Sequence, residues 1–156
     1  MKKIAIILVM LCGLTVYGQN DFILLSRDYP IIDVVVNGKR LAMLIDTGAD
    51  VNIIDSEIAK KYEAIVVPTL NYGVGAGSNF DLHDVRNLTC LVKNRMVAGF
   101  IATEIADAFK PIEIKTGIKI AGILGTPAIK ELGMVIDLSS GIVTINKNSE
   151  TTVSTD

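Results

Sequence analysis

One carboxylate in the sequence is placed where it could take part in chemistry. This is Asp46, which is followed by Thr47 and Gly48. These three residues alone are ordinary turn formers, because an acid, a hydroxyl and a glycine all favour tight turns. The residues before them are the apolar Leu44 and Ile45, so the acid leaves an apolar strand rather than a polar loop. A carboxylate in that position is partly desolvated, which changes how readily it holds a proton.

Two further segments could complete a site around this acid. Far downstream, Ile123, Leu124 and Gly125 end an apolar strand and lead into a segment with helix signals. Between the two lies a glycine-rich stretch, 71–80, flanked by strand-like residues. Glycines permit tight and mobile backbone, so residues 72–78 are interpreted as the tip of a hairpin that could close over a ligand.

The order of these segments resembles that of the retropepsin-like aspartic proteases, the family of the retroviral proteases, and in particular its bacterial exported branch. In that family a hydrophobic-hydrophobic-Asp-Thr-Gly-Ala segment forms the active-site turn, which residues 44–49 match. A later hydrophobic-hydrophobic-Gly strand passes behind the turn, which residues 123–125 match. The resemblance extends over about 22–146 and implies an all-β fold: a single acid-protease, closed-barrel lobe with one or two short helices, paired as a homodimer.

The resemblance implies an aspartic-type endopeptidase that uses a water molecule held between two carboxylates. The sequence contains one Asp-Thr-Gly, so the second carboxylate must come from a second copy of the chain. Asp46 is then the catalytic acid, with Thr47 and Gly48 forming its turn, and the partner is an extended peptide or protein substrate. The implied substrate-binding residues are Ala49, Asp50, Gly73, Gly75, Ala76 and Gly77, and the motif behind the site is Ile123, Leu124 and Gly125.

Two departures from the retroviral pattern concern how the turn and the dimer are supported. Retroviral members usually have an Arg after the downstream glycine that braces an acid beside the active-site Ala. Here Thr126 follows Gly125, so the role of Asp50, which matches the braced acid, stays open. Retroviral termini also interleave across the dimer, whereas the C-terminal residues here are polar, so the interface could be built differently.

The elements that must position these residues are mostly strands. Short β-branched runs separated by Gly and Asn predict antiparallel β structure. Strands 31–36 and 39–45 are joined by Asn37 and Gly38, which fit a type I′ turn, and the second strand delivers Asp46. Other strands are expected at 64–70, 81–85, 88–92, 97–101, 119–124, 134–137 and 142–146.

Helices are predicted to be few and short. Residues 56–62 follow Asp55, a good N-cap, and residues 126–133 begin at Thr126, which is expected to cap the second helix. The segment 104–109 is expected to form a single helical turn.

The other reactive side chains receive structural interpretations. With His83 as its one histidine, the chain lacks the usual zinc-binding sets, and neither a metal nor another cofactor is expected. His83 is interpreted as a surface strand residue, and Cys90 as a core residue. The remaining carboxylates lie beside turn or cap signals and are expected to accept backbone hydrogen bonds: Asp33, Asp50, Asp55 and Asp137.

Residues 1–18 are predicted to be a signal peptide, since Lys2 and Lys3 precede an apolar run at 4–11 that is too short to span a bilayer. The protein is therefore expected to be exported, periplasmic or secreted, with a retropepsin-like domain at 19–146. An uncleaved anchor is the alternative, and lipoprotein anchoring at Cys12 is disfavoured because no small residue precedes it. The polar segment 147–156 is expected to be a disordered tail.

Charge and motif content leave two other functions open. Loss of Lys2 and Lys3 would change the formal net charge from −2 to −4, which disfavours nucleic-acid binding. One alternative is a non-catalytic retropepsin-fold binding or assembly module in the cell envelope. The other is a monomeric structural β protein with a fortuitous Asp-Thr-Gly.

Overall fold

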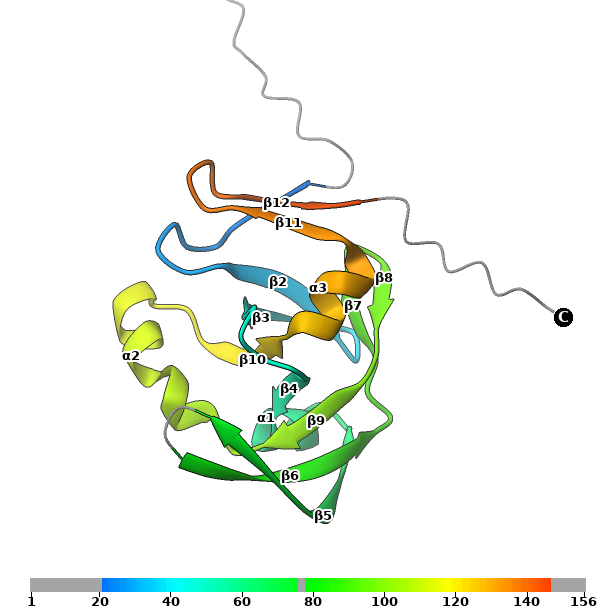
Figure 1. The fold of residues 1–156 in the computed structure, drawn as a ribbon. Coiled ribbons are helices and arrows are strands. Elements are labelled where there is room, and N and C mark those ends of the chain that lie inside the picture. Colours follow the sequence, from blue (N-terminus) through cyan, green and yellow to red (C-terminus); the bar gives the residue numbers. More distant parts are fainter. Residues whose placement is uncertain (1–20, 76–77, 147–156) are drawn as a thin grey trace, which may run out of the picture.

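The computed structural model describes residues 21–75 and 78–146 (Figure 1). The predicted signal peptide at 1–18, the hairpin-tip residues Ala76 and Gly77, and the predicted tail at 147–156 lie outside the described residues.

Strands dominate the described chain, which confirms the all-β class. The strands are β1 (Asp21–Ile23), β2 (Ile31–Val36), β3 (Lys39–Ile45), β4 (Asn52–Asp55), β5 (Ile65–Gly75), β6 (Ser78–Arg86), β7 (Cys90–Val92), β8 (Arg95–Val97), β9 (Phe100–Thr103), β10 (Ile120–Leu124), β11 (Met134–Asp137) and β12 (Ile142–Ile145). The helices are α1 (Ser56–Lys61), α2 (Ala106–Thr116) and α3 (Thr126–Leu132).

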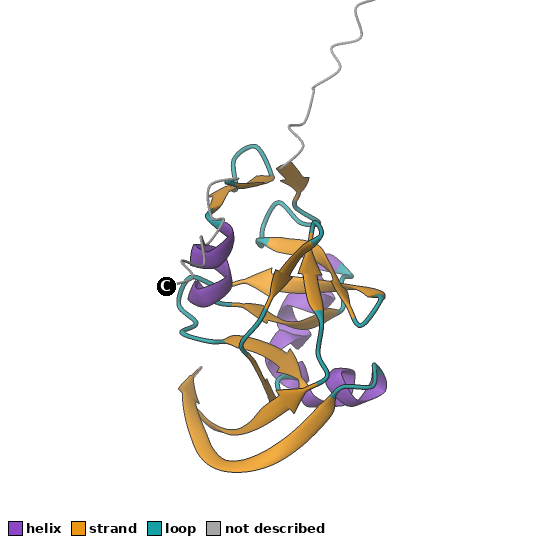
Figure 2. Cartoon of the chain, turned by 90° about the vertical axis from the view of Figure 1, so that its right-hand side faces the viewer, coloured by secondary structure: helices purple, strands orange, loops and turns teal. Residues whose placement is uncertain are grey.

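Nine strands form one strongly curved sheet, in the order β5-β6-β9-β4-β10-β3-β2-β7-β8 (Figure 2). The expected closed barrel is replaced by an open sheet, because the order ends at β5 on one side and at β8 on the other. The sheet is also not wholly antiparallel, since β10 runs parallel to β3 and β9 runs parallel to β4. The parallel pair of β3 and β10 matters for function, because both strands end at the same edge of the sheet.

The hairpin of β2 and β3 has the predicted turn. Asn37 has φ of 44° and Gly38 has φ of 78°, the two positive values that a type I′ turn requires. Strand pairing runs from Val36 with Lys39 to Ile31 with Leu44. This tight hairpin fixes the register of β3 and therefore the position at which Asp46 leaves the sheet.

A separate three-stranded sheet has the order β1-β12-β11. β12 pairs with β11 on one side and with β1 on the other, through pairs such as Asp21 with Thr144. Both edges of β12 are thus occupied by strands of the same chain. A second chain cannot insert a strand beside β12, which differs from the interleaved termini of the retroviral pattern.

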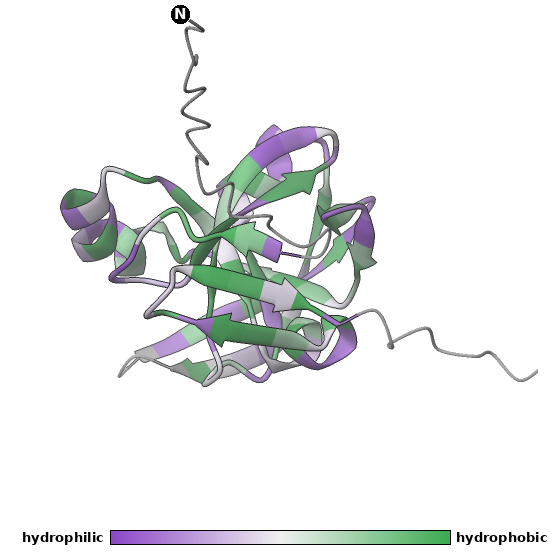
Figure 3. Cartoon of the chain, turned by 90° about the horizontal axis from the view of Figure 1, so that it is seen from above, coloured by the Kyte–Doolittle hydropathy of each residue, from purple (hydrophilic) through white to green (hydrophobic). Residues whose placement is uncertain are grey.

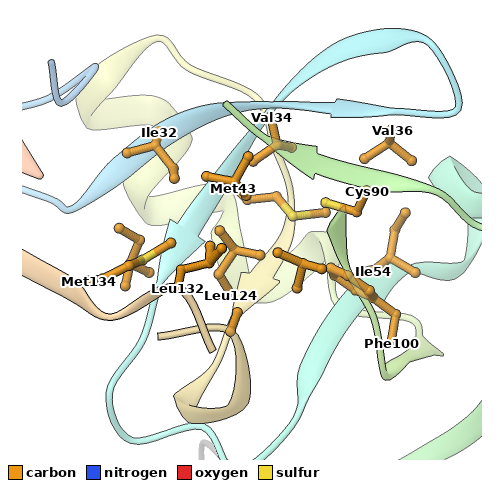
Figure 4. Close-up of a cluster of buried hydrophobic side chains, with 14 of the residues drawn as sticks. Ile32, Val34, Val36, Met43, Ile54, Cys90, Phe100, Leu124, Leu132 and Met134 are labelled. Carbon is orange, nitrogen blue, oxygen red and sulfur yellow. The ribbon is translucent and has the colours of Figure 1, made fainter. Parts of the chain in front are cut away.

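Hydrophobic residues concentrate in the strands, and hydrophilic residues gather at turns and on helix surfaces (Figure 3). The main core lies between the strands and α3, and Figure 4 shows part of it. Cys90 is fully buried there, and burial raises the pKa of its thiol to about 12. The thiol therefore stays protonated and acts as a core residue, as predicted.

A second, smaller cluster connects the site region to α2. Its buried members come from β2, β3, β10 and α2, and Leu44, Ala49 and Ile53 pack against it. Phe109 of α2 is 3% exposed and belongs to this cluster. Burial of such an aromatic ring contributes about 2 kcal/mol or more, which explains why the segment forms an 11-residue helix rather than the single turn expected.

The sequence signals predicted helices α1 and α3 correctly, apart from the N-cap of α3 and the total number of helices. The side chain of Asp55 caps α1 as predicted, and Gly133 closes α3 in the left-handed conformation. The N-cap of α3 is Gly125, however, and Thr126 is the first helical residue. The described chain thus contains three helices, where one or two were expected, because α2 continues through Pro111 to Gly117.

Candidate active site

Asp46 lies at the end of β3, where the chain leaves the sheet and turns toward β4. β10 runs beside β3 in parallel, with Leu44 opposite Ile123 and Ile45 opposite Leu124. The backbone N–H of Asp46 donates a hydrogen bond to the carbonyl of Leu124, at 3.0 Å. The structure thus brings together the two segments that the sequence singled out, although they are almost 80 residues apart.

The turn itself holds the Asp46 side chain. The N–H of Gly48 donates to Asp46 Oδ1 at 2.8 Å, and the N–H of Ala49 donates to the carbonyl of Asp46 at 3.3 Å. Asp46 is half-buried, while Thr47 and Gly48 are exposed. Its second oxygen, Oδ2, has no hydrogen-bond partner within the described residues, so it remains available to a ligand.

Asn52 supports the turn from behind and was not identified from the sequence. It is fully buried, its Oδ1 accepts a hydrogen bond from the N–H of Gly125 at 3.0 Å, and its Nδ2 donates to the carbonyl of Ala98 at 2.9 Å. A buried amide with both ends paired holds two strands in a fixed relation. The signal was available, because Asn52 is a polar residue between Val51 and Ile53 in a buried strand.

Gly125 fits because it lacks a side chain. A Cβ at this position would lie 2.2 Å from the carbonyl oxygen of Val51 and 2.7 Å from that of Ala49. Both contacts are with backbone of the turn, so they cannot be relieved by rotating a side chain. The Ile123, Leu124 and Gly125 segment thus lies directly behind the turn.

Thr126 supplies the brace at the position where the retroviral pattern has Arg. Its N–H donates to the carbonyl of Ala49 at 2.8 Å, and its hydroxyl donates to the carbonyl of Thr47 at 3.3 Å. Asp50 is exposed, and its carboxylate has no hydrogen bond or ion pair within the described residues. The turn is therefore held by hydrogen bonds from Thr126, and the structure gives Asp50 no bracing role.

The glycine-rich segment forms the predicted hairpin, from β5 and β6, with Gly73 opposite Phe80 and Gly75 opposite Ser78. The hairpin extends from the edge of the sheet (Figures 1 and 2). No hydrogen bond between described residues joins it to the Asp46 turn. One chain thus carries both parts of the predicted site, and the described residues show no hydrogen bond between them.

Two cavities lie outside the Asp46 turn. The first, about 630 Å³, is bounded by α1, by the starts of β3 and β10, and by the start of α2. The second, about 230 Å³, lies between β6 and the end of β9. Asp46 lines neither of these two cavities, and its half-buried side chain keeps Oδ2 without a hydrogen bond from the described residues.

The alternative carboxylates have structural roles. Buried Asp55 accepts hydrogen bonds from Glu57 and Ile58 through Oδ1, and from Ile105 and Ala106 through Oδ2, so it joins α1 to the start of α2. This confirms the predicted capping role.

Asp137 also accepts hydrogen bonds as predicted, in the turn between β11 and β12. Hydrogen bonds from Ser139 and Ser140 lower the pKa of Asp137 to about 2. Asp33 differs from expectation, because it forms an exposed ion pair with Arg40 at 3.5 Å. His83 also differs, because it is partly buried and its Nδ1 is buried without a hydrogen-bond partner.

Neither a metal centre nor a membrane helix is found in the part of the chain that the structure describes. No group of three or more His, Cys, Asp and Glu side chains at 21–75 and 78–146 is placed to hold a metal ion. None of the helices in these ranges is long and apolar enough to cross a membrane.

Comparison with solved structures shows that the fold is that of the retropepsin-like proteases. Equine infectious anaemia virus (EIAV) protease, in complex with the inhibitor HBY-793, is 20% identical, with a TM-score of 0.53 over 70% of this chain and 92% of that chain. A retropepsin-like aspartic protease from Rickettsia conorii is 16% identical, with a TM-score of 0.53 over 80% of this chain and 89% of that chain. The retroviral protease-like domain of Ddi1 from Leishmania major is 17% identical, with a TM-score of 0.50 over 75% of this chain and 87% of that chain.

The family follows from the sequence as well. Residues 32–128 match the family model described as aspartyl protease, so this chain belongs to the aspartyl protease family. The matched segment contains the Asp46 turn, the hairpin and Gly125. A search among curated protein sequences found no significant match.

Proposed function

We propose that this protein is an aspartic endopeptidase that works as a homodimer, with Asp46 of each protomer facing the other across a two-fold axis. The observation that carries the proposal is the Asp46 turn, which supplies one of the two carboxylates that the reaction needs. Asp46 is held by the N–H of Gly48 and braced from behind by β10, yet its Oδ2 is unpaired and no second carboxyl group is hydrogen-bonded to it within the described residues. A two-fold axis beside this turn would supply the missing acid.

Two Asp46 carboxylates at close range cannot both be ionised cheaply, so the pair would hold one shared proton. The ionised carboxylate removes a proton from a water molecule, and the water oxygen attacks the carbonyl carbon of the peptide. The protonated carboxyl donates its proton to the carbonyl oxygen, which gives a neutral tetrahedral diol. The carboxyl that took the water proton then donates it to the peptide nitrogen, the other carboxylate accepts a proton from a diol hydroxyl, and the C–N bond breaks to release an amine and a carboxylic acid, which restores the shared proton.

Neighbouring residues would position the substrate. Gly48 and Ala49 offer backbone groups at the exposed turn, and Thr47 would hydrogen-bond across the two turns. The hairpin of β5 and β6 would close over the peptide and exclude water from the reacting atoms. Asp50, which is exposed and has no bracing role, is free to contact the peptide beside Ala49.

The proposal includes export of the protein to the periplasm or the cell exterior, because residues 1–18 have the pattern of a signal peptide. The substrates would then be peptides or proteins of that compartment.

Cleavage of a peptide library between pH 3 and pH 8, with the oligomeric state recorded, tests the proposal. Cleavage by the wild-type dimer and none by Asp46→Asn is expected. Asp28→Asn is the matched control, because Asp28 is an exposed acid that pairs with Lys115 and is not hydrogen-bonded to the Asp46 turn within the described residues. A dimer that is inert at every pH would favour the non-catalytic binding module, and an inert monomer would favour a structural role.

A further inference from the structure

The smaller cavity, about 230 Å³, lies between strand β6 of the hairpin and the end of β9, and has the properties of a binding pocket for one side chain. It is lined by Asn79, Phe80, Asp81, His83, Thr103 and Glu104. Four of these lie on β6, close behind the hairpin tip, and the other two lie at the end of β9. Pockets for whole small molecules usually exceed about 300 Å³, so this volume suits a single side chain.

Two polar groups in the pocket lack partners. Thr103 is 3% exposed, and its hydroxyl has no hydrogen-bond partner within the described residues. The Nδ1 atom of His83 is buried and also has no partner. Nearly all buried polar groups in folded proteins are hydrogen-bonded, so the buried, unpaired Nδ1 of His83, in the same cavity as the Thr103 hydroxyl, indicates that a ligand could complete the site.

The charges at the pocket select the kind of ligand. Asp81 and Glu104 are exposed, and neither forms an ion pair within the described chain. No Lys or Arg lines the cavity, so an acidic ligand would be repelled. A lysine ammonium or an arginine guanidinium carries only hydrogen-bond donors, which matches the Thr103 hydroxyl oxygen, the two carboxylates and the unpaired Nδ1 of His83.

From this we propose that the pocket binds a Lys or Arg side chain of the peptide substrate, so that the peptidase prefers a basic residue near the scissile bond. The inference rests on the proposed function, because the same hairpin that would cover the peptide supplies Asn79 and Phe80 to the pocket. Asp81 and Glu104 provide the charge preference, and Thr103 and His83 orient the bound cation.

Paired peptides test the inference with the full-length chain. Each pair carries either lysine or norleucine at one position near the cleaved bond, since norleucine keeps most of the apolar stem and removes the charge. We expect a higher kcat/KM for the lysine peptide at one position. Glu104→Gln and Asp81→Asn should each reduce that lysine preference about twofold to fivefold, the range for an exposed ion pair, and the double variant should reduce it further.

Two more variants test whether the lysine preference depends on the pocket or on the net charge of the protein. Thr103→Val keeps the buried volume, removes the unpaired hydroxyl, and should also lower the lysine preference. Glu131→Gln removes an equal charge from the exposed surface of α3 and should leave the preference unchanged. Cleavage without a basic preference at any position, or a preference that survives in the double variant, would overturn the inference while leaving the peptidase assignment intact.

Absence of all cleavage would instead count against the proposed function. The pocket is then tested by fluorescence anisotropy, with labelled lysine and norleucine peptides bound to the Asp46→Asn chain. Tighter binding of the lysine peptide, lost in the Asp81→Asn and Glu104→Gln background, supports the pocket. Equal binding of the two peptides contradicts it.

Discussion

The Asp46 turn and the β5–β6 hairpin belong to the same candidate site but are held in opposite ways. The turn donates a hydrogen bond to the carbonyl of Leu124 and accepts hydrogen bonds from Thr126 and its own Gly48. Gly125 packs so closely behind it that a single methyl group would not fit. The hairpin is paired to the rest of the sheet only near its base, where His83 and Asp84 meet β9.

The side chains show the same contrast. Leu70, Tyr72 and Val74 lie at alternate positions of β5 and are 91%, 69% and 87% exposed, so the described residues leave this apolar stripe uncovered. A reacting carboxylate must be held in place before the substrate arrives, whereas a covering element must be able to move. The Asp46 turn is thus the rigid part of the candidate site, and the β5–β6 hairpin is the part that can move.

The largest effect on stability and activity is expected from Gly125→Ala, which disrupts the packing behind the Asp46 turn. The added Cβ would meet two backbone oxygens of the turn at 2.2 Å and 2.7 Å, so the turn must shift. We expect a loss of about 3 kcal/mol or more in the free energy of unfolding, and no detectable peptide cleavage. Urea denaturation and a cleavage assay measure the two effects.

Gly99→Ala is the matched control for this change. Gly99 has φ of +72° but open space around its Cβ position, so only the backbone preference is lost. That cost is about 1 kcal/mol. Equal destabilisation by the two variants would show that close packing behind the turn is unimportant.

Asn52→Leu should have the next largest effect, because it keeps the approximate volume and removes both hydrogen bonds. The N–H of Gly125 would be left unpaired in a buried place, and the carbonyl of Ala98 would lose its partner in a partly buried one. We expect a cost of about 2 to 4 kcal/mol, with kcat reduced more than KM, because the turn is displaced rather than the peptide contacts. Unchanged kcat in a folded variant would mean that the Asn52 hydrogen bonds do not position Asp46.

A change in the hairpin should affect activity more than stability. The Cβ of Gly73→Ala would approach the flexible side chain of Leu82 at 3.1 Å, which can move aside. We expect less than about 1 kcal/mol of destabilisation, and a reduced kcat/KM because the covering element is stiffer. Adding Leu82→Val should restore part of the activity if crowding is the cause, and no recovery would argue against it.

The smallest effect is expected at Asp137, which lies outside both regions. Hydrogen bonds from Ser139 and Ser140 lower its folded-state pKa from 3.8 to about 2. The stabilisation is therefore complete above pH 4 and is lost as the pH falls from 3.8 toward 2. Asp137→Ala should lower Tm at pH 6, and the difference from wild type should shrink at pH 2 while cleavage at pH 6 stays normal. A constant Tm difference across this range would refute the assignment.

The sequence predicted much of the rigid part because local chemistry determines it. Asn37 and Gly38 specify one turn type, Asp55 caps a helix, and the apolar residues before Asp46 place it at the end of a strand. The signals for these features lie within a few residues of one another.

The features that were missed depend on contacts between distant segments. The burial of Phe109 extends α2, and Asn52 acquires its role only when β4 lies between β9 and β10. The pairing of β1 with β12, which occupies one edge of β12 within the same chain, joins residues more than 100 positions apart. No local pattern of residues predicts such pairings. The open edges of the curved sheet, at β5 and β8, are likewise a property of the whole fold.

The central claim, that one active site is built from two copies of Asp46, is tested most directly by mixing wild-type and Asp46→Asn chains under conditions that allow subunit exchange. If both carboxylates are required, only dimers of two wild-type chains cleave peptide, so an equal mixture should keep about one quarter of the activity of an all-wild-type sample at the same total concentration. Retention of about one half would mean that each chain works alone, which would contradict the account.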